Sequence, residues 1–207
     1  MKNIFGICLL VLSFVSCKKA GISALPDYLP MTAGSTWTYQ PSVGSSYTLT
    51  ATNKDTVAHG KTFKVFTGTN GQNRYRMKAA NEYYQLTIIP QLSPDGFAEL
   101  FLKDNQAVGA NWKSSLPVNV PTIPIPLTAN LLYTIKAKDT TRTVSGKIFK
   151  KVVHVNLDVS IPPLGSVGGG NFYFADKVGL IESSMLVTMQ GQQVVNQSEV
   201  LTSYSIK

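Results

Sequence analysis

Residues 47–64 read YTLTATNKDTVAHGKTFK, and residues 133–150 read YTIKAKDTTRTVSGKIFK. Both stretches open on a tyrosine and continue with apolar and polar residues in alternation, which is the pattern of a strand that buries one face. Each then reaches a Gly-Lys pair, where the chain is expected to turn, and a phenylalanine follows on the returning strand. Each stretch therefore predicts a β-hairpin.

The two hairpins agree with each other, and shorter matches flank them in the same order. The hairpins align without a gap when Tyr47 is placed on Tyr133, an offset of 133 − 47 = 86 positions. The flanking matches are Gly34-x-x-Trp37 with Gly109-x-x-Trp112, and Asn73-Arg74-Tyr75 with Asn171-Phe172-Tyr173. Ordered agreement favours an internal duplication over chance similarity between hairpins. We predict one β domain, residues 30–207, built from repeat halves of about 30–105 and 106–207.

The rest of the chain also favours strands. Only 14% of its residues are charged, and it contains 16 Gly and 11 Pro, a composition that suits strands and turns better than surface helices. The one ambiguous stretch follows Ser93, which could cap a helix with Pro94 in its first turn, but which reads equally as a strand. We predict a mainly β fold of about eight to ten antiparallel strands in a curved sheet, a sandwich or an open barrel.

Two apolar stretches stand out in the second half. Residues 117–127, PVNVPTIPIPL, contain four prolines, which remove donors from a strand ladder and predict an extended loop or a sheet edge. Residues 160–171, SIPPLGSVGGGN, read as a glycine-rich loop. Apolar loops need cover from protein, lipid or ligand. The candidate residues for lining an apolar ligand site are Val118, Val120, Ile123, Ile125, Leu164 and Val167.

The first residues have the organisation of a secretory signal peptide. Lys2 gives a short positive start, and the apolar run 4–15 follows. This run is too short to cross a bilayer core, which needs roughly 20 helical residues. The cysteines of the chain are Cys8 and Cys17. Removal of residues 1–16 would leave no thiol inside the domain for a disulfide, catalysis or a metal.

The end of this leader, Phe14-Val15-Ser16-Cys17, resembles the lipobox of bacterial lipoproteins, with Phe14 in place of the usual Leu. The resemblance implies cleavage between Ser16 and Cys17 and acylation of Cys17, with residues 17–29 as a lipidated tether. Two or three acyl chains hold a protein on a membrane more firmly than one. By the same resemblance, Lys18 favours the outer membrane, on its periplasmic face, with the cell surface as the alternative.

Longer motifs carry a second resemblance. These motifs are Leu29-Pro30-Met31-x-x-Gly34-x-x-Trp37-x-Tyr39, Gly109-x-x-Trp112 and the stretch FYFADKVGLI at residues 172–181. Together they are similar to a group of uncharacterised Bacteroidota-type secreted lipoproteins, which implies an architecture and no activity. Trp37 and Trp112 are interpreted as core anchors rather than as ligand platforms.

The charge distribution gives no strong sign of nucleic acid. The net charge is +8, but the lysines are scattered, which favours solvated faces. Arg74, Arg76 and Lys78 alternate with Tyr75 and Met77 and therefore share one face of a strand. Such a stripe could bind an anionic ligand or surface, although a solvated outer face is the favoured interpretation.

No catalytic or metal motif is found. The two histidines are His59, in a predicted turn, and His154. His154 and Asp158 share a strand face, but their backbones would lie roughly 13 Å apart at the rise of a strand. Gly168-Gly169-Gly170 is not followed by the Lys-Ser/Thr helix start that a phosphate-binding loop requires. We predict neither a metal site nor a cofactor.

The function that these features favour is a membrane-anchored envelope lipoprotein with a non-enzymatic binding or structural role. Its expected partners are the membrane, through Cys17, and either an apolar ligand or an envelope protein. The alternative is an envelope glycan hydrolase with two carboxylates within about 5–10 Å across a cleft. The candidates for that pair are Asp104, Asp158, Asp176 and Glu182. Asp55-Thr56 and Asp139-Thr140 also resemble the O-glycosylation sites of some Bacteroidota proteins.

Overall fold

The computed structural model describes residues 26–89, 93–118 and 127–207, which form twelve β-strands in one sheet. The described residues contain no helix. The strands are β1 (Thr36–Pro41), β2 (Tyr47–Ala58), β3 (Lys61–Gly68), β4 (Arg74–Ala79), β5 (Glu82–Ile89), β6 (Ser93–Lys103), β7 (Asn111–Val118), β8 (Leu127–Val144), β9 (Lys147–Ile161), β10 (Gly165–Ala175), β11 (Gly179–Met189) and β12 (Gln192–Ser205).

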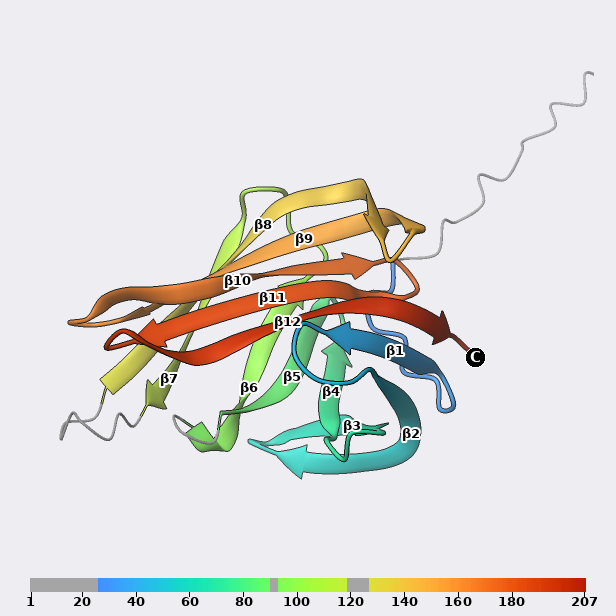
Figure 1. Ribbon diagram of the computed structural model, residues 1–207, viewed down its shortest axis with the longest axis horizontal. Helices are drawn as coiled ribbons and strands as arrows, with labels where there is room; N and C mark the ends of the chain where they lie inside the picture. The colour runs from blue at the N-terminus through green and yellow to red at the C-terminus, as the bar shows by residue number, and fades with distance from the viewer. Residues whose placement is uncertain (1–25, 90–92, 119–126) are drawn as a thin grey trace, which may run out of the picture.

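The sheet is an all-antiparallel meander that curls into a nearly closed barrel shape (Figure 1). Its strand order is β6-β5-β4-β3-β2-β1-β12-β11-β10-β9-β8-β7, so β1 and β12 pair in the middle and join the two halves of the chain. β6 and β7 are the two edges. Curling a sheet of this size brings its edges together and encloses a space on its concave face.

Side chains from both edges fasten the seam between β6 and β7. The indole Nε1 of Trp112 donates a hydrogen bond of 2.8 Å to the backbone carbonyl of Leu100. The hydroxyl of Tyr133 crosses the same seam and donates to Glu99 over 2.5 Å. The rings of Trp112 and Tyr133 stack with centroids 5.6 Å apart. These contacts close the barrel shape without a ladder of backbone hydrogen bonds.

The predicted alternation of apolar and polar residues sets which face is inside. In β9, Val155 and Leu157 are buried, whereas the intervening Asn156 is only partly buried and Asp158 is exposed. The same alternation places Tyr133 and Ile135 of β8 inside. Burial of a large apolar side chain contributes roughly 1.5–3 kcal/mol, so the inward rows of twelve strands supply the main stabilisation.

One end of the barrel shape is closed by the segment that precedes β1. Tyr28 and Leu29 are buried, and the ring of Tyr28 lies 6.4 Å from that of Tyr83. The amide of Lys177 donates to the backbone carbonyl of Asp27 over 2.6 Å. The last residues of the predicted tether are therefore packed into the body of the protein, and they form the floor of its interior.

The two hairpins that predicted the fold are formed, and their turns share a geometry. His59 and Gly60 have φ of 48° and 70°, and Ser145 and Gly146 have φ of 49° and 75°. Two positive φ values are what a two-residue type I′ turn requires. The predicted offset places these turns on each other, which supports the duplication; the duplication itself stays a prediction.

Several finer expectations need correction. The sheet has twelve strands rather than eight to ten, and it is one curled sheet rather than a sandwich. The ambiguous stretch after Ser93 is strand β6. Residues 160–171 are not a loop, because β9 ends at Ile161 and β10 begins at Gly165. Residues 119–126 of the other apolar stretch lie outside the described residues. Pro117, which begins that stretch, lies in the edge strand β7, as the prolines of the stretch predicted.

The glycine run lies inside the sheet because its neighbours leave no room for side chains. A Cβ on Gly168 would lie 2.0 Å from the carbonyl oxygen of Leu186 in β11, and one on Gly169 would lie 2.1 Å from that of Leu157 in β9. Glycine in a strand marks this kind of close backbone approach. The run is thus a packing feature of β10. Within the part of the chain that the structure describes, no helix has the length and apolar character needed to cross a bilayer.

Candidate functional site

The concave face of the sheet encloses a cavity of about 970 Å³. Tyr28 and Leu29 line its closed end, and the exposed residues Val43, Asn70 and Gln197 line the opposite end. Small-molecule sites are concave and have volumes of about 300–1,000 Å³. The interior of this sheet is therefore large enough to hold a ligand, and one of its ends is open.

The second half of the chain gives the cavity an apolar wall. Inward positions of β7, β8 and β9 carry aliphatic side chains, and β10 adds Phe172 and Phe174. The aliphatic residues are Leu116, Val118, Ala129, Leu131, Leu157 and Val159. All six are buried by the surrounding protein. A surface of this kind favours an apolar ligand over water.

Polar side chains of β4 and its neighbours form a polar wall of the cavity, whereas β5 and β6 of the same half add Leu86, Ile88, Phe97 and Phe101. Arg74 lies near the open end. Its Nη1 donates to Oε1 of Glu199 from β12 and its Nη2 donates to Oε2, both over 2.8 Å. The hydroxyl of Tyr47 also donates to Glu199. The guanidinium lies 5.4 Å from the ring centroid of Tyr47. A bidentate pair with an aromatic partner is a strong form of charge recognition.

Arg76 lies one inward position deeper on β4 and has no such partner. Only 6% of its surface is exposed, and its Nε has no hydrogen-bond partner within the described residues. Its guanidinium carbon lies 5.6 Å from the ring centroid of Phe66. Burial lowers the pKa of this guanidinium, because desolvation disfavours the charged form. Arg76 is therefore a buried cation that lines the cavity without a carboxylate.

Two glutamates line the cavity, the buried Glu99 and the partly buried Glu199, and each is hydrogen-bonded to groups other than Arg76. Glu99 of β6 is 5% exposed and accepts from Tyr133 across the seam and from Gln85 over 2.8 Å. Thr87 donates to it as well. Burial alone would raise the pKa of Glu199, but the hydrogen bonds and charge of Arg74, the hydrogen bond of Tyr47 and the charge of Arg76 together lower it below its ordinary value. Glu199 is therefore held ionised mainly by Arg74, and Arg76 has the smallest of these effects.

The tyrosines beside these glutamates are held protonated. Burial raises the pKa of Tyr39 to about 12, with the charge of Arg76 opposing the effect. Burial also raises the pKa of Tyr47 and of Tyr133 well above the ordinary value, and the neighbouring glutamates add to the rise. These hydroxyls are consequently fixed hydrogen-bond donors near neutral pH. They are poor candidates for proton transfer.

The structure places one of the residues predicted to line an apolar ligand site on the cavity, and its role toward a ligand stays a prediction. Val118 lines the cavity at its apolar wall. Val120, Ile123, Ile125, Ser16 and Cys17 lie outside the described residues. Leu164 is exposed in the turn between β9 and β10, and Val167 is buried in the core. Neither of these two residues lines the cavity, because the stretch that carries them forms a tight hairpin instead of a loop.

The stripe on β4 was assigned to the wrong face. Arg74 and Arg76 line the cavity, so the face that they share with Lys78 by alternation is the inner one and not a solvated outer one. Lys78 lies toward the floor and pairs with Asp27 over 3.0 Å. Sequence reasoning missed Glu199, Glu99 and the two tyrosines that donate to them. The only available signal was that Tyr47 and Tyr133 occupy matching inward positions.

The four carboxylates of the hydrolase alternative each occupy a different environment. Asp104 is buried and accepts from Tyr83 over 2.6 Å, and Glu182 pairs with Arg142 over 2.8 Å. Asp176 accepts from the amide of Asp27 over 2.9 Å, and Asp158 is exposed on β9. None of the four lines the large cavity. Among the residues described, no group of three or more His, Cys, Asp and Glu side chains could hold a metal.

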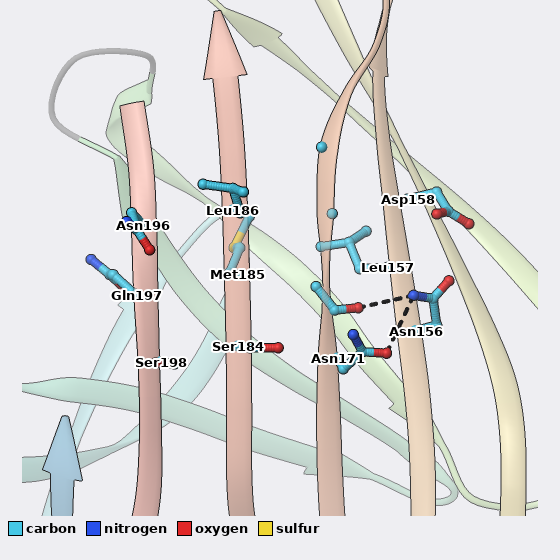
Figure 2. Close-up of a pocket in the computed structure, with 13 residues that line it drawn as sticks. Asn156, Leu157, Asp158, Asn171, Ser184, Met185, Leu186, Asn196, Gln197 and Ser198 are labelled. Carbon is cyan, nitrogen blue, oxygen red and sulfur yellow. Dashed lines mark hydrogen bonds between the residues drawn. The ribbon is translucent and has the colours of Figure 1, made fainter. Parts of the chain in front are cut away.

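A shallower hollow of about 400 Å³ lies over β9–β12, where Gly168, Gly169 and Gly170 leave the surface without side chains (Figure 2). The amide of Asn156 donates over 3.1 Å to the carbonyl of Gly170 and faces Asn171 beside it (Figure 2). Some of the polar side chains that line the hollow are thus hydrogen-bonded within the sheet. The hollow follows from the close packing of β10.

Comparison with known proteins gives the fold alone. No protein-family model matches the chain, and no curated protein sequence matches it significantly. A candidate lipoprotein of known structure from Parabacteroides distasonis is similar, with a TM-score of 0.51, 11% identity, and 88% of this chain and 100% of that chain covered. This likeness shows a shared fold.

Two further solved structures are more distant. A candidate exported protein with a YmcC-like fold from Bacteroides fragilis has a TM-score of 0.45 at 10% identity, with 87% of this chain and 100% of that chain covered. The hypothetical lipoprotein YmcC from Escherichia coli also has a TM-score of 0.45 at 10% identity, with 82% of this chain and 83% of that chain covered.

Proposed function

We propose that this protein is a lipid-anchored envelope lipoprotein that binds an apolar ligand inside its barrel-shaped sheet, without catalysing a reaction. The observation that carries the proposal is the cavity of about 970 Å³ with a continuous apolar wall from β7 to β10. An interior of this size and character is the usual site for small hydrophobic molecules in curled sheets.

The envelope location rests on the leader. Residues 1–16 have the composition of a signal peptide, and Cys17 follows them at the lipobox position. The shared fold with a candidate lipoprotein agrees with this location. We place the anchor in the outer membrane on its periplasmic face. Replacement of Cys17 by Ser is expected to abolish labelling by palmitate and to release the protein from the membrane fraction; labelling that persists would contradict the anchor.

Ligand binding is tested by filling the cavity. Ala129 is buried on the apolar wall, and Phe at this position would occupy space that a ligand needs. Thr128 is exposed on the preceding position of the same strand and serves as the matched control. We expect native mass spectra of the wild-type protein and of Thr128→Phe to show a bound lipid-sized mass, and those of Ala129→Phe to lack it. Equal occupancy in all three would place the ligand elsewhere.

A further inference from the structure

Arg76 lines the cavity without an ion pair to any described carboxylate, because the neighbouring negative charge, Glu199, is paired with Arg74. Three cations follow one another along the inner face of β4. Arg74 pairs with Glu199, and Lys78 pairs with Asp27, whereas no described carboxylate pairs with Arg76. A buried, unpaired charge is costly for a protein to keep.

The neighbouring carboxylates, Glu199 and Glu99, are already hydrogen-bonded to other groups. Both oxygens of Glu199 already accept from Arg74. Glu99 lies two strands away in register, beyond Gln85, which donates to it. The Nε–H of Arg76 therefore remains an unused donor among the described residues, at a water-restricted site where a charge-assisted hydrogen bond is strong.

The two walls of the cavity are chemically opposite. Aliphatic side chains from β7–β9 form one wall, and Arg76 belongs to the other. A molecule that satisfies both needs a long apolar part and an anionic oxygen group. A carboxylate or a phosphate fits the fork of a guanidinium, which presents parallel N–H donors.

Resting on the proposed function, we infer that the cavity binds an anionic amphiphile, with its acyl chain along the apolar wall of β7–β9 and its carboxylate or phosphate on Arg76. Both a free fatty acid and a single-chain phospholipid carry this chemistry. Arg76 is the specificity-determining residue of the site. The apolar wall supplies affinity without distinguishing charged from neutral head groups.

The test compares three probes with a common acyl chain: palmitate, 1-palmitoyl lysophosphatidate and neutral monopalmitoylglycerol. Binding to the full-length protein is measured in a bulky sterol-based detergent, with each probe below its micelle concentration. We expect both anions to bind at least roughly tenfold more tightly than the glyceride, the range that a hydrogen bond to a charged group provides. The tighter of the two anions identifies the carboxylate or the phosphate as the preferred group.

Arg76→Gln is expected to weaken binding of both anions roughly ten- to hundredfold and to leave glyceride binding within about twofold. Arg142→Gln removes the same charge from an outer-face pair with Glu182 and is expected to keep the preference for anions. Arg76→Lys keeps the cation without the fork and is expected to retain a preference of a few-fold.

The outcomes separate this inference from the proposal on which it rests. If the wild-type protein binds the glyceride as tightly as the anions, or if Arg76→Gln keeps the preference, the role of Arg76 is refuted while an apolar ligand site remains. If Ala129→Phe binds all three probes like the wild-type protein, the cavity is not the site, and the proposed function falls with the inference.

Discussion

Strands β4 and β10, which the predicted duplication matches, turn different chemistry toward the same interior. The proposed duplication places Arg74 and Arg76 of β4 on Phe172 and Phe174 of β10, at an offset of 98 positions (172 − 74 = 98). Arg76 and Phe174 are both buried, at 6% and 4% exposure. One fold position thus holds a cation in the first half and an aromatic ring in the second. A buried cation costs more free energy to keep than a buried ring, and this difference agrees with the ligand-binding role inferred for Arg76.

A second matched pair shows what the halves share. Tyr47 of β2 donates to Glu199 of β12, and Tyr133 of β8 donates to Glu99 of β6. In the curled sheet each pair reaches across one intervening strand, β1 in the first case and β7 in the second. The glutamates differ in their further partners, since only Glu199 accepts from an arginine. Both halves therefore contribute a tyrosine that hydrogen-bonds a glutamate, and the first half adds Arg74 to one of these contacts.

The largest effect is expected when the ion pair of the polar wall is broken. Glu199→Gln leaves Arg74 and Arg76 without a neighbouring negative charge; the Arg74–Glu199 pair is partly buried, so the loss is expected to be about 2 to 3 kcal/mol of unfolding free energy, between that of a surface pair and that of a fully buried one. Urea unfolding measures the change. The matched control is Glu182→Gln, whose pair with Arg142 is partly exposed and should cost less than about 1 kcal/mol. Equal losses would mean that the polar wall is no more critical than the surface.

A smaller loss is expected from crowding the second half. Gly169→Ala would bring a methyl group to 2.1 Å from the carbonyl oxygen of Leu157, so β9 and β10 must separate. We expect a loss of about 2 kcal/mol, the usual range for overpacking. Ser166→Ala on the same strand is exposed and should change stability little. A Gly169→Ala protein as stable as the wild type would show that this close approach is dispensable.

One substitution at each of the matched positions, Arg76 and Phe174, is expected to change the unfolding free energy in opposite directions. Arg76→Met removes a buried charge and should raise the unfolding free energy by about 1 kcal/mol, because hydrophobic replacement of buried charges is neutral or stabilising. Phe174→Met should lower it by about 1 kcal/mol. Thermal unfolding in the absence of lipid measures both. A destabilised Arg76→Met protein would show that the cation supports the fold.

The smallest expected effect concerns acid stability. The pKa of Glu199 in the folded protein lies below its ordinary value of 4.5, so its ionised form stabilises the fold above that pH. This contribution is lost as the pH falls through the lowered pKa. We expect the stability of the wild-type protein to decline in this acid range, and that of Glu199→Gln to decline less steeply. Parallel declines in urea midpoints would remove Glu199 from the explanation.

The sequence was sufficient for the β fold because alternation is a local signal. The hairpins at His59-Gly60 and Ser145-Gly146 could be located from their own residues. The glycine run of β10 was misread, because the need for glycine arises from β9 and β11 and not from neighbouring residues in the sequence. The predicted number of strands was too low partly because this stretch, which forms the start of β10, was read as a loop.

The polar wall could be predicted only in part. The alternation put Arg74, Arg76 and Lys78 on one face, but the opposite face carries the less polar Tyr75, Met77 and Ala79, so the local pattern marked the wrong face as the inner one. The partner that makes Arg74 acceptable inside, Glu199, lies 125 positions away in the sequence. The apolar wall was anticipated at Val118 alone, since the other lining residues follow from how the sheet curls.

The structure of protein purified from native membranes tests most directly whether the interior of the sheet holds an anionic amphiphile. The prediction is elongated density along the apolar wall of β7–β9, ending in a branched group within hydrogen-bond distance of the Arg76 guanidinium. A cavity that contains only ordered water, with Arg76 solvated by it, would contradict the claim.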